Sequence, residues 1–255
     1  MKKTIIYILM AVLMISMLGL SACGNKDQAA EPENTLDAVE DGGDAALDGG
    51  WTVTDNIAVE LPEAVQSAFD KALETLTGSY NEVTPIAYLG RQVVSGTNYA
   101  VLFRVTYADE KAPAGLVVLT VYEDLEGNAE LLSSEEFSIA DYNTGDEGTE
   151  VNTEEEPMTG GWQMPEQITA AEIPEEAMNA FNKAVEGFTG NDLTPMALLG
   201  TQVVAGTNYA FLCHSKLVTA EPSESIQVVI VYEDLEGNAA ITGISNVDVS
   251  RYVNN

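Results

Sequence analysis

The first candidate for covalent chemistry in this sequence of 255 residues is a cysteine next to a histidine, Cys213 and His214. A thiol activated by an imidazole is a common nucleophile. However, both residues lie in a segment whose composition predicts a β-strand, where neighbouring side chains point to opposite faces. They align with Phe103 and Arg104 of an earlier, similar segment. We therefore expect Cys213 in the core and His214 at the surface, and we predict that the protein is not an enzyme.

Two acidic stretches, Glu123–Asn128 and Glu233–Asn238, are the second candidate, because carboxylates can bind Ca²⁺. Both lack the alternating ligands and the closing glutamate of a hand-type calcium loop. A Gly-Asn hairpin turn is the other interpretation, and it is the one that we favour. Cys213 and His214 make a poor metal site, and the sequence has no zinc-ligand spacing. We therefore predict neither a metal ion nor a cofactor.

A nine-residue string, QVVSGTNYA at Gln92–Ala100, returns 110 positions later as QVVAGTNYA at Gln202–Ala210. Hairpin tips are usually polar because they face water, yet this one carries two valines beside a Gly-Thr-Asn turn. An exposed apolar loop that occurs twice indicates a binding surface. In the alternative interpretation the glycines supply a positive φ, the asparagines hold the turn and the valines pack inward. Residue chemistry alone leaves both interpretations open.

The two strings belong to a longer duplication, which relates residues 51–140 to residues 162–253. The string YEDLEGNA, for example, occurs without a difference at Tyr122–Ala129 and at Tyr232–Ala239. Each block opens with apolar residues at helical spacing between a proline and a glycine. This pattern predicts an amphipathic helix of about four turns in each block, over Pro62–Gly78 and Pro174–Gly190.

After each helix the apolar residues recur with a period of two, which is typical of strands. In the first block we expect strands at 83–94, 99–107, 116–122 and 129–139. In the second of these, Val101, Phe103 and Val105 form the more apolar face, opposite Leu102. The predicted fold is α+β, with two tandem domains, each having one amphipathic helix packed on a four- to five-stranded antiparallel sheet. We expect a charged linker of about twenty residues to keep the two blocks apart and independent.

The first 23 residues resemble a bacterial lipoprotein signal peptide, with two lysines, an apolar run and the lipobox string LSAC. The resemblance implies lipidation of Cys23 and a protein secreted and anchored to the outer face of a bacterial membrane or cell surface. An ordinary signal peptide and an uncleaved membrane helix are the alternatives. Residues 24–48 and 141–159 are acidic and poor in large apolar residues, so we predict a disordered stalk and an acidic linker around domains at 49–140 and 160–255.

The net charge of −31, from 10 Lys and Arg against 41 Asp and Glu, excludes several partners. Nucleic acid and anionic lipid head groups would be repelled. We therefore expect contact with a membrane only through the lipid on Cys23. A basic protein would be attracted, although solubility is the simpler reason for such a charge.

The string QVVAGTNYA resembles the first inhibitory hairpin of the cystatin family, and of the stefins in particular, whose motif is Gln-X-Val-X-Gly. In that family a glycine segment before the first strand, this hairpin and a second hairpin form a wedge that fills the cleft of papain-like cysteine proteases. The resemblance implies two tandem cystatin-like domains that inhibit such proteases reversibly and competitively. The protease-binding residues that it implies are Gly49, Gly50, Gln92, Val93, Val94, Ser95, Gly96, Leu125, Gly160, Gly161, Gln202, Val203, Val204, Ala205, Gly206 and Leu235.

The second hairpin departs from the family pattern. Secreted cystatins have Pro-Trp there and stefins commonly Leu-Pro, whereas both turns of this chain read Asp-Leu-Glu-Gly. An acidic turn weakens insertion into an apolar cleft or selects a cleft with a basic rim. The alternative function is a cell-surface binding or spacer module with a cystatin-like fold and no inhibitory activity. We expect a monomer, with a domain-swapped dimer as the alternative that the resemblance implies.

Overall fold

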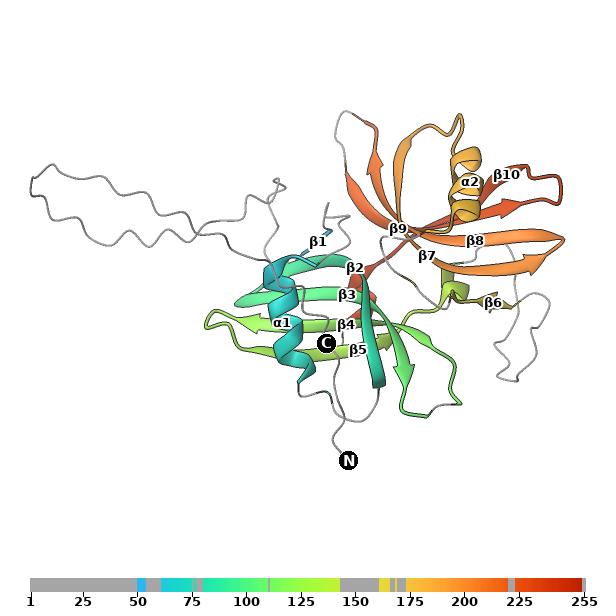
Figure 1. Ribbon diagram of the computed structural model, residues 1–255. Coiled ribbons are helices and arrows are strands. Elements are labelled where there is room, and N and C mark those ends of the chain that lie inside the picture. The colour runs from blue at the N-terminus through green and yellow to red at the C-terminus, as the bar shows by residue number, and fades with distance from the viewer. Residues whose placement is uncertain are drawn as a thin grey trace, which may run out of the picture. The chain divides into compact units, whose positions relative to one another are not determined.

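Segments rich in valine, threonine and aromatic residues form a five-stranded antiparallel sheet in the first half of the chain (Figure 1). Such side chains fit the pleated surface of a sheet. The strands follow one another in chain order as β1 (Trp51–Val53), β2 (Tyr80–Val93), β3 (Gly96–Tyr107), β4 (Gly115–Asp124) and β5 (Ala129–Glu136). The second half repeats this order with β6 (Trp162–Gln163), β7 (Asn191–Val204), β8 (Gly206–Leu217), β9 (Glu224–Glu233) and β10 (Ala239–Asn246).

Both sheets belong to the part of the chain that this computed structural model describes. The described residues are 50–53, 61–74, 76, 80–109, 111–142, 161–165, 168, 173–219 and 223–253. They lie within one compact unit, Asp44–Asn255. The signal peptide with Cys23, the stalk at 24–48 and residues 143–159 of the linker lie outside the described residues, so these assignments stay predictions.

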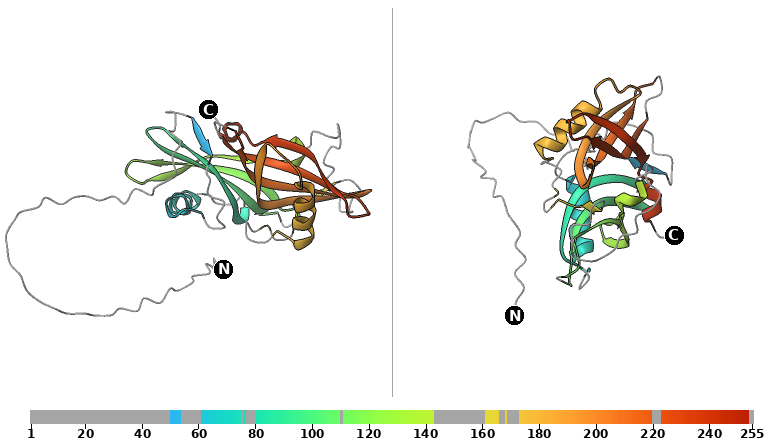
Figure 2. Two further views of the ribbon diagram at one scale, coloured as in Figure 1. Left: turned by 90° about the horizontal axis from the view of Figure 1, so that it is seen from above. Right: turned by 90° about the vertical axis from the view of Figure 1, so that its right-hand side faces the viewer.

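Two short helices, α1 (Glu63–Leu73) and α2 (Glu175–Ala184), each begin directly after a proline. Proline suits this position because its fixed φ matches a helix and its missing N–H would have no partner there. The Phe69 ring of α1 packs 5.3 Å from the Phe103 ring of β3. With 11 and 10 residues, both helices are shorter than the four turns expected. Figure 2 shows each helix on one side of its own sheet.

The prediction of an α+β fold is wrong, because the described residues are mostly β: they form two antiparallel five-stranded sheets and only two short helices. The physical reason is that the central strands are buried on both faces. Val101 and Phe103 of β3 join the core cluster on the side of α1. Leu102, on the opposite face, is also fully buried, and it shares a cluster with Leu199 and Leu212 of the second sheet. The two sheets thus bury a common core, and each helix adds to the remaining face.

The segment that follows the last strand of each half completes this common core. The short 3₁₀ turns η1 (Ile139–Tyr142) and η2 (Val249–Tyr252) come after β5 and β10. The hydroxyl oxygens of Tyr142 and Tyr252 lie 2.7 Å apart. The Phe137 ring stacks on both tyrosines, at centroid distances of 5.1 and 6.0 Å. Burial raises the pKa of both phenols, as expected for hydroxyls removed from water.

Hydrogen bonds to the backbone hold each of these turns against the other half. Thr120 and Ser133 of the first sheet donate hydrogen bonds to the carbonyl of Tyr252. Ser245 of the second sheet donates one to the carbonyl of Tyr142. Tyr142 was expected in the linker, but it lies in the core. The expectation that the linker keeps the two blocks apart is therefore wrong, whereas independent binding by the two blocks stays a prediction.

Replacing Phe137 with alanine should destabilise both halves together, because its ring stacks on a tyrosine from each half. Loss of a buried phenylalanine costs about 3–5 kcal/mol. Urea unfolding followed by tryptophan fluorescence measures this, since Trp51 and Trp162 lie in different sheets. The exposed Leu132 of β5 offers a matched control, and Leu132→Ala should cost less than about 1 kcal/mol. Two separate transitions, with only that of Trp51 shifted, would contradict the common core.

Candidate functional site

The repeated valines are exposed at the tips of the β2–β3 and β7–β8 hairpins, so they do not pack inward. Between 37% and 55% of the surface of each residue is accessible in this group, which is Val93, Val94, Val203 and Val204. The residues between the strands, Ser95 and Ala205, are exposed as well. Apolar side chains at both tips therefore face solvent, where a partner can reach them.

The strand register brings three of the expected site segments to one end of the first sheet. Gln92 of β2 pairs with the β1 residue that follows Gly50, so Gly50 lies beside the β2–β3 tip. Gly96, the first residue of β3, pairs with Asp124, the last residue of β4. The β4–β5 turn with Leu125 therefore lies next to the same tip.

The second sheet has the same register, so its glycine, valines and leucine also lie at one end. The other two glycines assigned to the site, Gly49 and Gly160, lie outside the described residues. We call these two groups of residues the tips. The first tip is Gly50, Val93, Val94, Ser95 and Leu125, and the second tip is Gly161, Val203, Val204, Ala205 and Leu235. Ten large apolar side chains are exposed in the described residues, and six of them belong to the two tips.

The side chain of Asp124 holds the shape of the β4–β5 turn. One of its carboxylate oxygens accepts hydrogen bonds from the backbone N–H groups of Glu126 and Asn128, each at 2.8 Å. The other accepts one from the side-chain amide of Asn128, also at 2.8 Å. The hydrogen bonds from Asn128 lower the pKa of Asp124, so this carboxylate is ionised at neutral pH. The turn holds Leu125 outward, with 88% of its surface exposed.

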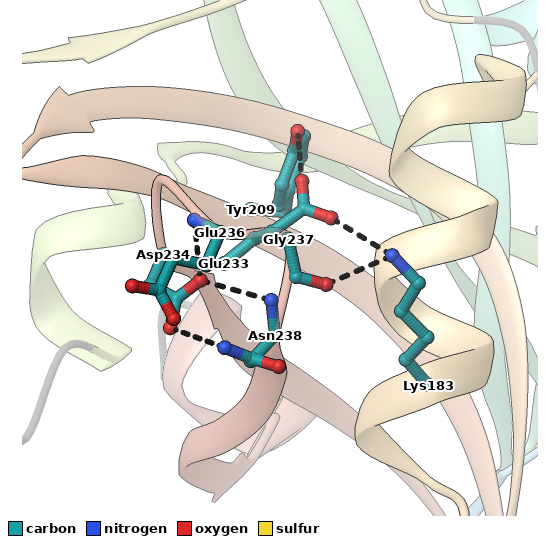
Figure 3. A network of polar contacts seen from close by, with 7 residues as sticks. All are labelled: Lys183, Tyr209, Glu233, Asp234, Glu236, Gly237 and Asn238. Carbon is teal, nitrogen blue, oxygen red and sulfur yellow. Dashed lines mark hydrogen bonds and ion pairs between the residues drawn. The ribbon is translucent and has the colours of Figure 1, made fainter.

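The β9–β10 turn repeats this arrangement and is fastened to α2 by a lysine (Figure 3). Asp234 accepts three hydrogen bonds of the same kind within the turn. Lys183 Nζ donates to the carbonyl oxygen of Gly237 at 2.9 Å and lies 3.4 Å from a carboxylate oxygen of Glu233. Leu235 is again held outward, with 87% of its surface exposed.

Lys71 of α1 has the same role in the first half, and the sequence analysis missed both lysines. Lys71 Nζ donates to the carbonyl oxygen of Gly127 at 2.7 Å and lies 3.6 Å from Glu123. The sequence contained a signal for this shared role, because Lys71 and Lys183 have matching positions: each is the ninth residue of its helix. The two acidic stretches are hairpin turns, the interpretation that the sequence favoured. Across the described ranges, no group of three His, Cys, Asp or Glu side chains is placed to hold a metal ion.

The two hairpins of each tip approach so closely that only glycine fits between them. A Cβ atom on Gly96 would lie 2.3 Å from the carbonyl oxygen of Glu123 and 2.6 Å from the ring of Tyr122. The Tyr122 hydroxyl donates a hydrogen bond to the carbonyl of Ser95 at 3.0 Å. The same contacts surround Gly206. The close approach of the two hairpins thus explains why the repeated string has a glycine at this position. Contact between this glycine and a protease stays a prediction.

The glutamines of the repeated strings also serve the sheet. The side-chain oxygens of Gln92 and Gln202 accept hydrogen bonds from the side-chain amides of Asn98 and Asn208, each at 2.7 Å. These bonds join the two strands directly below each tip. The polar residues of the string therefore fix the hairpin, while its valines remain available to a partner.

Cys213 lies in the core as expected, whereas the prediction for His214 is wrong. Cys213 is fully buried in the cluster beside α2, and burial raises the pKa of its thiol. His214 was expected to face solvent, but it is buried, and its Nε2 lies 3.2 Å from a carboxylate oxygen of Glu224. The sequence misled here because the matching Arg104 is a typical surface residue.

Comparison with known proteins assigns neither a family nor a function, because no family model matches the sequence and no curated protein matches it significantly. The likeness to cystatins therefore rests on the quoted residues alone. Within the described part of the chain, no helix combines the length and the apolar composition needed to cross a membrane. What the tips bind must be argued from their own geometry.

Replacing Gly206 with alanine should lower the free energy of unfolding by about 1–3 kcal/mol, because its Cβ would lie 2.3 Å from the carbonyl oxygen of Glu233. Urea unfolding measures the change. Ala205→Ser is the matched control, since serine occupies this position in the first half as Ser95, and it should leave the stability unchanged. Equal stabilities of the two variants would show that the two hairpins move apart easily. This result would contradict the close contact between them at Gly206.

Proposed function

We propose that both tips are protease-binding surfaces and that the protein is a lipid-anchored, reversible and competitive inhibitor of papain-like cysteine proteases. The observation that supports this most is the convergence of a glycine, two exposed valines and an exposed leucine at one end of each sheet. An apolar edge of this kind fits a narrow cleft that has its catalytic residues at the bottom. The inhibitor performs no chemistry, because the tip occupies the cleft and excludes the substrate.

The apolar residues of a tip supply enough binding energy only when they act together. Fully burying one valine or leucine is worth about 1.5–3 kcal/mol, and the valines are already about half buried. Association costs about 4–15 kcal/mol in lost freedom of motion. Two half-buried valines do not meet this cost. The leucine and the backbone beside Gly50 or Gly161 must therefore contact the protease in the same complex.

A second candidate function is a cell-surface binding module for a protein that is not a protease. The exposed carboxylates Glu126 and Glu236 favour it, because a charge is costly to bring into an apolar cleft. Recovery of other proteins from secretions, together with no inhibition of several papain-like enzymes, would support this function instead.

Titration of papain with the purified full chain tests the proposed inhibition. The wild-type chain should inhibit reversibly and in competition with substrate. The double variant Val94→Glu, Val204→Glu places a carboxylate in each apolar tip. Its inhibition constant should rise about 100-fold or more, since an unpaired charge in an apolar cleft costs about 3 kcal/mol or more.

The matched control is Val218→Glu. Val218 is also an exposed valine, but it follows the last residue of β8, at the opposite end of the sheet from the second tip. This variant should inhibit like the wild type. No inhibition by the wild type at micromolar concentration, or full inhibition by the double variant, would refute the proposal.

A further inference from the structure

Leu125 and Leu235 are the most exposed large apolar side chains of the described residues, at 88% and 87%. A single exposed leucine is common on protein surfaces. These two differ because each lies beside an exposed pair of valines and in a turn that is fixed from two directions. Asp124 holds the first turn internally, and Lys71 fastens it to α1. A leucine held in one place loses little conformational freedom on binding, which suits an anchor.

The charge around Leu125 is unbalanced, because Asp124 and Glu126 form no ion pair among the described residues. Glu123 forms an ion pair with the lysine of α1 at 3.6 Å, and Asp124 accepts the hydrogen bonds of the turn. Glu126 is exposed, and among the described residues no ion pair includes it. Glu236 has the same position and the same exposure in the second turn. Each tip thus presents, directly after its leucine, one exposed carboxylate that forms no ion pair and accepts none of the hydrogen bonds that hold the turn.

We infer that these turns determine which protease the tips select. The leucine enters an apolar pocket of the cleft, and Glu126 or Glu236 meets a lysine or arginine on the rim. This inference rests on the proposed function and names its target class, a papain-like protease with a basic rim. The net charge of −31 favours the same class, because it repels acidic surfaces. Exposed ion pairs add little affinity, so the rim charge acts mainly on the association rate.

Two forms of one protease test the inference: papain, and papain with two residues beside its cleft replaced by lysine. Association of the full chain, measured by stopped flow, should be about threefold to tenfold faster with the lysine form at low salt. The difference should shrink at about 0.5 M NaCl, where charges are screened over a few ångströms. Leu125→Ala, Leu235→Ala should weaken the inhibition of both forms equally, whatever the salt concentration.

A pair of double variants separates the turns from the charge of the whole chain. Glu126→Gln, Glu236→Gln should keep the inhibition and lose the preference for the lysine form. The matched control, Glu82→Gln, Asp192→Asn, removes the same number of charges from exposed positions near the starts of β2 and β7. Because these positions lie at the other end of the sheets, the control should retain the full preference.

The outcomes distinguish this inference from the proposed function. Inhibition of both proteases with equal association rates would overturn the inference and leave the proposed function standing. If the Glu126→Gln, Glu236→Gln variant still associates faster with the lysine form, the preference comes from the charge of the whole chain. This result would also overturn the inference. No inhibition of either protease would overturn the proposed function, and the inference with it.

Discussion

The burial of both faces of each sheet is the constraint on which the rest of the structure depends. Along β3 and β4, side chains that face the helix, such as Val101, alternate with side chains that face the other sheet, such as Leu102 and Val118. Fully burying one such side chain is worth about 1.5–3 kcal/mol. One sheet with its second face in water would therefore lose stabilisation as large as the whole net stability of a domain, about 5–15 kcal/mol. The turns that end in Tyr142 and Tyr252 complete the core, and they make the two halves depend on one another.

This common core explains why the strand ends can carry residues that do not contribute to folding. The strands are held along their length by the two clusters on their faces. At the tip itself, polar contacts fix the geometry: Asn98 donates to Gln92, and Tyr122 donates to the carbonyl of Ser95. None of these contacts needs the side chain of Val94. The tips are therefore rigid while their apolar side chains remain exposed, which lowers the entropy lost on binding.

Local patterns in the sequence predicted the strand positions and the helix starts, but not the class of the fold. Alternation identified the face of β3 that carries Val101. It could not show what covers Leu102, because that cover comes from residues about 110 positions away. Tyr142 was placed in the linker because acidic residues surround it, although its ring belongs to the core. The composition of the tips left open whether their valines are exposed or packed inward. The role of Lys71 depended on a contact between a helix and a distant turn.

The two halves differ in a way that separates residues needed for the fold from residues left to a partner. In the core, Val101 and Phe103 correspond to Phe211 and Cys213, so the large ring has moved by two positions on one face and still meets the phenylalanine of its helix. Cores tolerate such exchanges when the volume is kept. The glutamine and asparagine that join the strands below each tip have not changed, and they make the same hydrogen bond in both halves. The valines and the leucine of each tip have not changed either, although 37–55% of the surface of each valine and 87–88% of that of each leucine is exposed. The proposed binding of both tips to the same class of protease would account for keeping them.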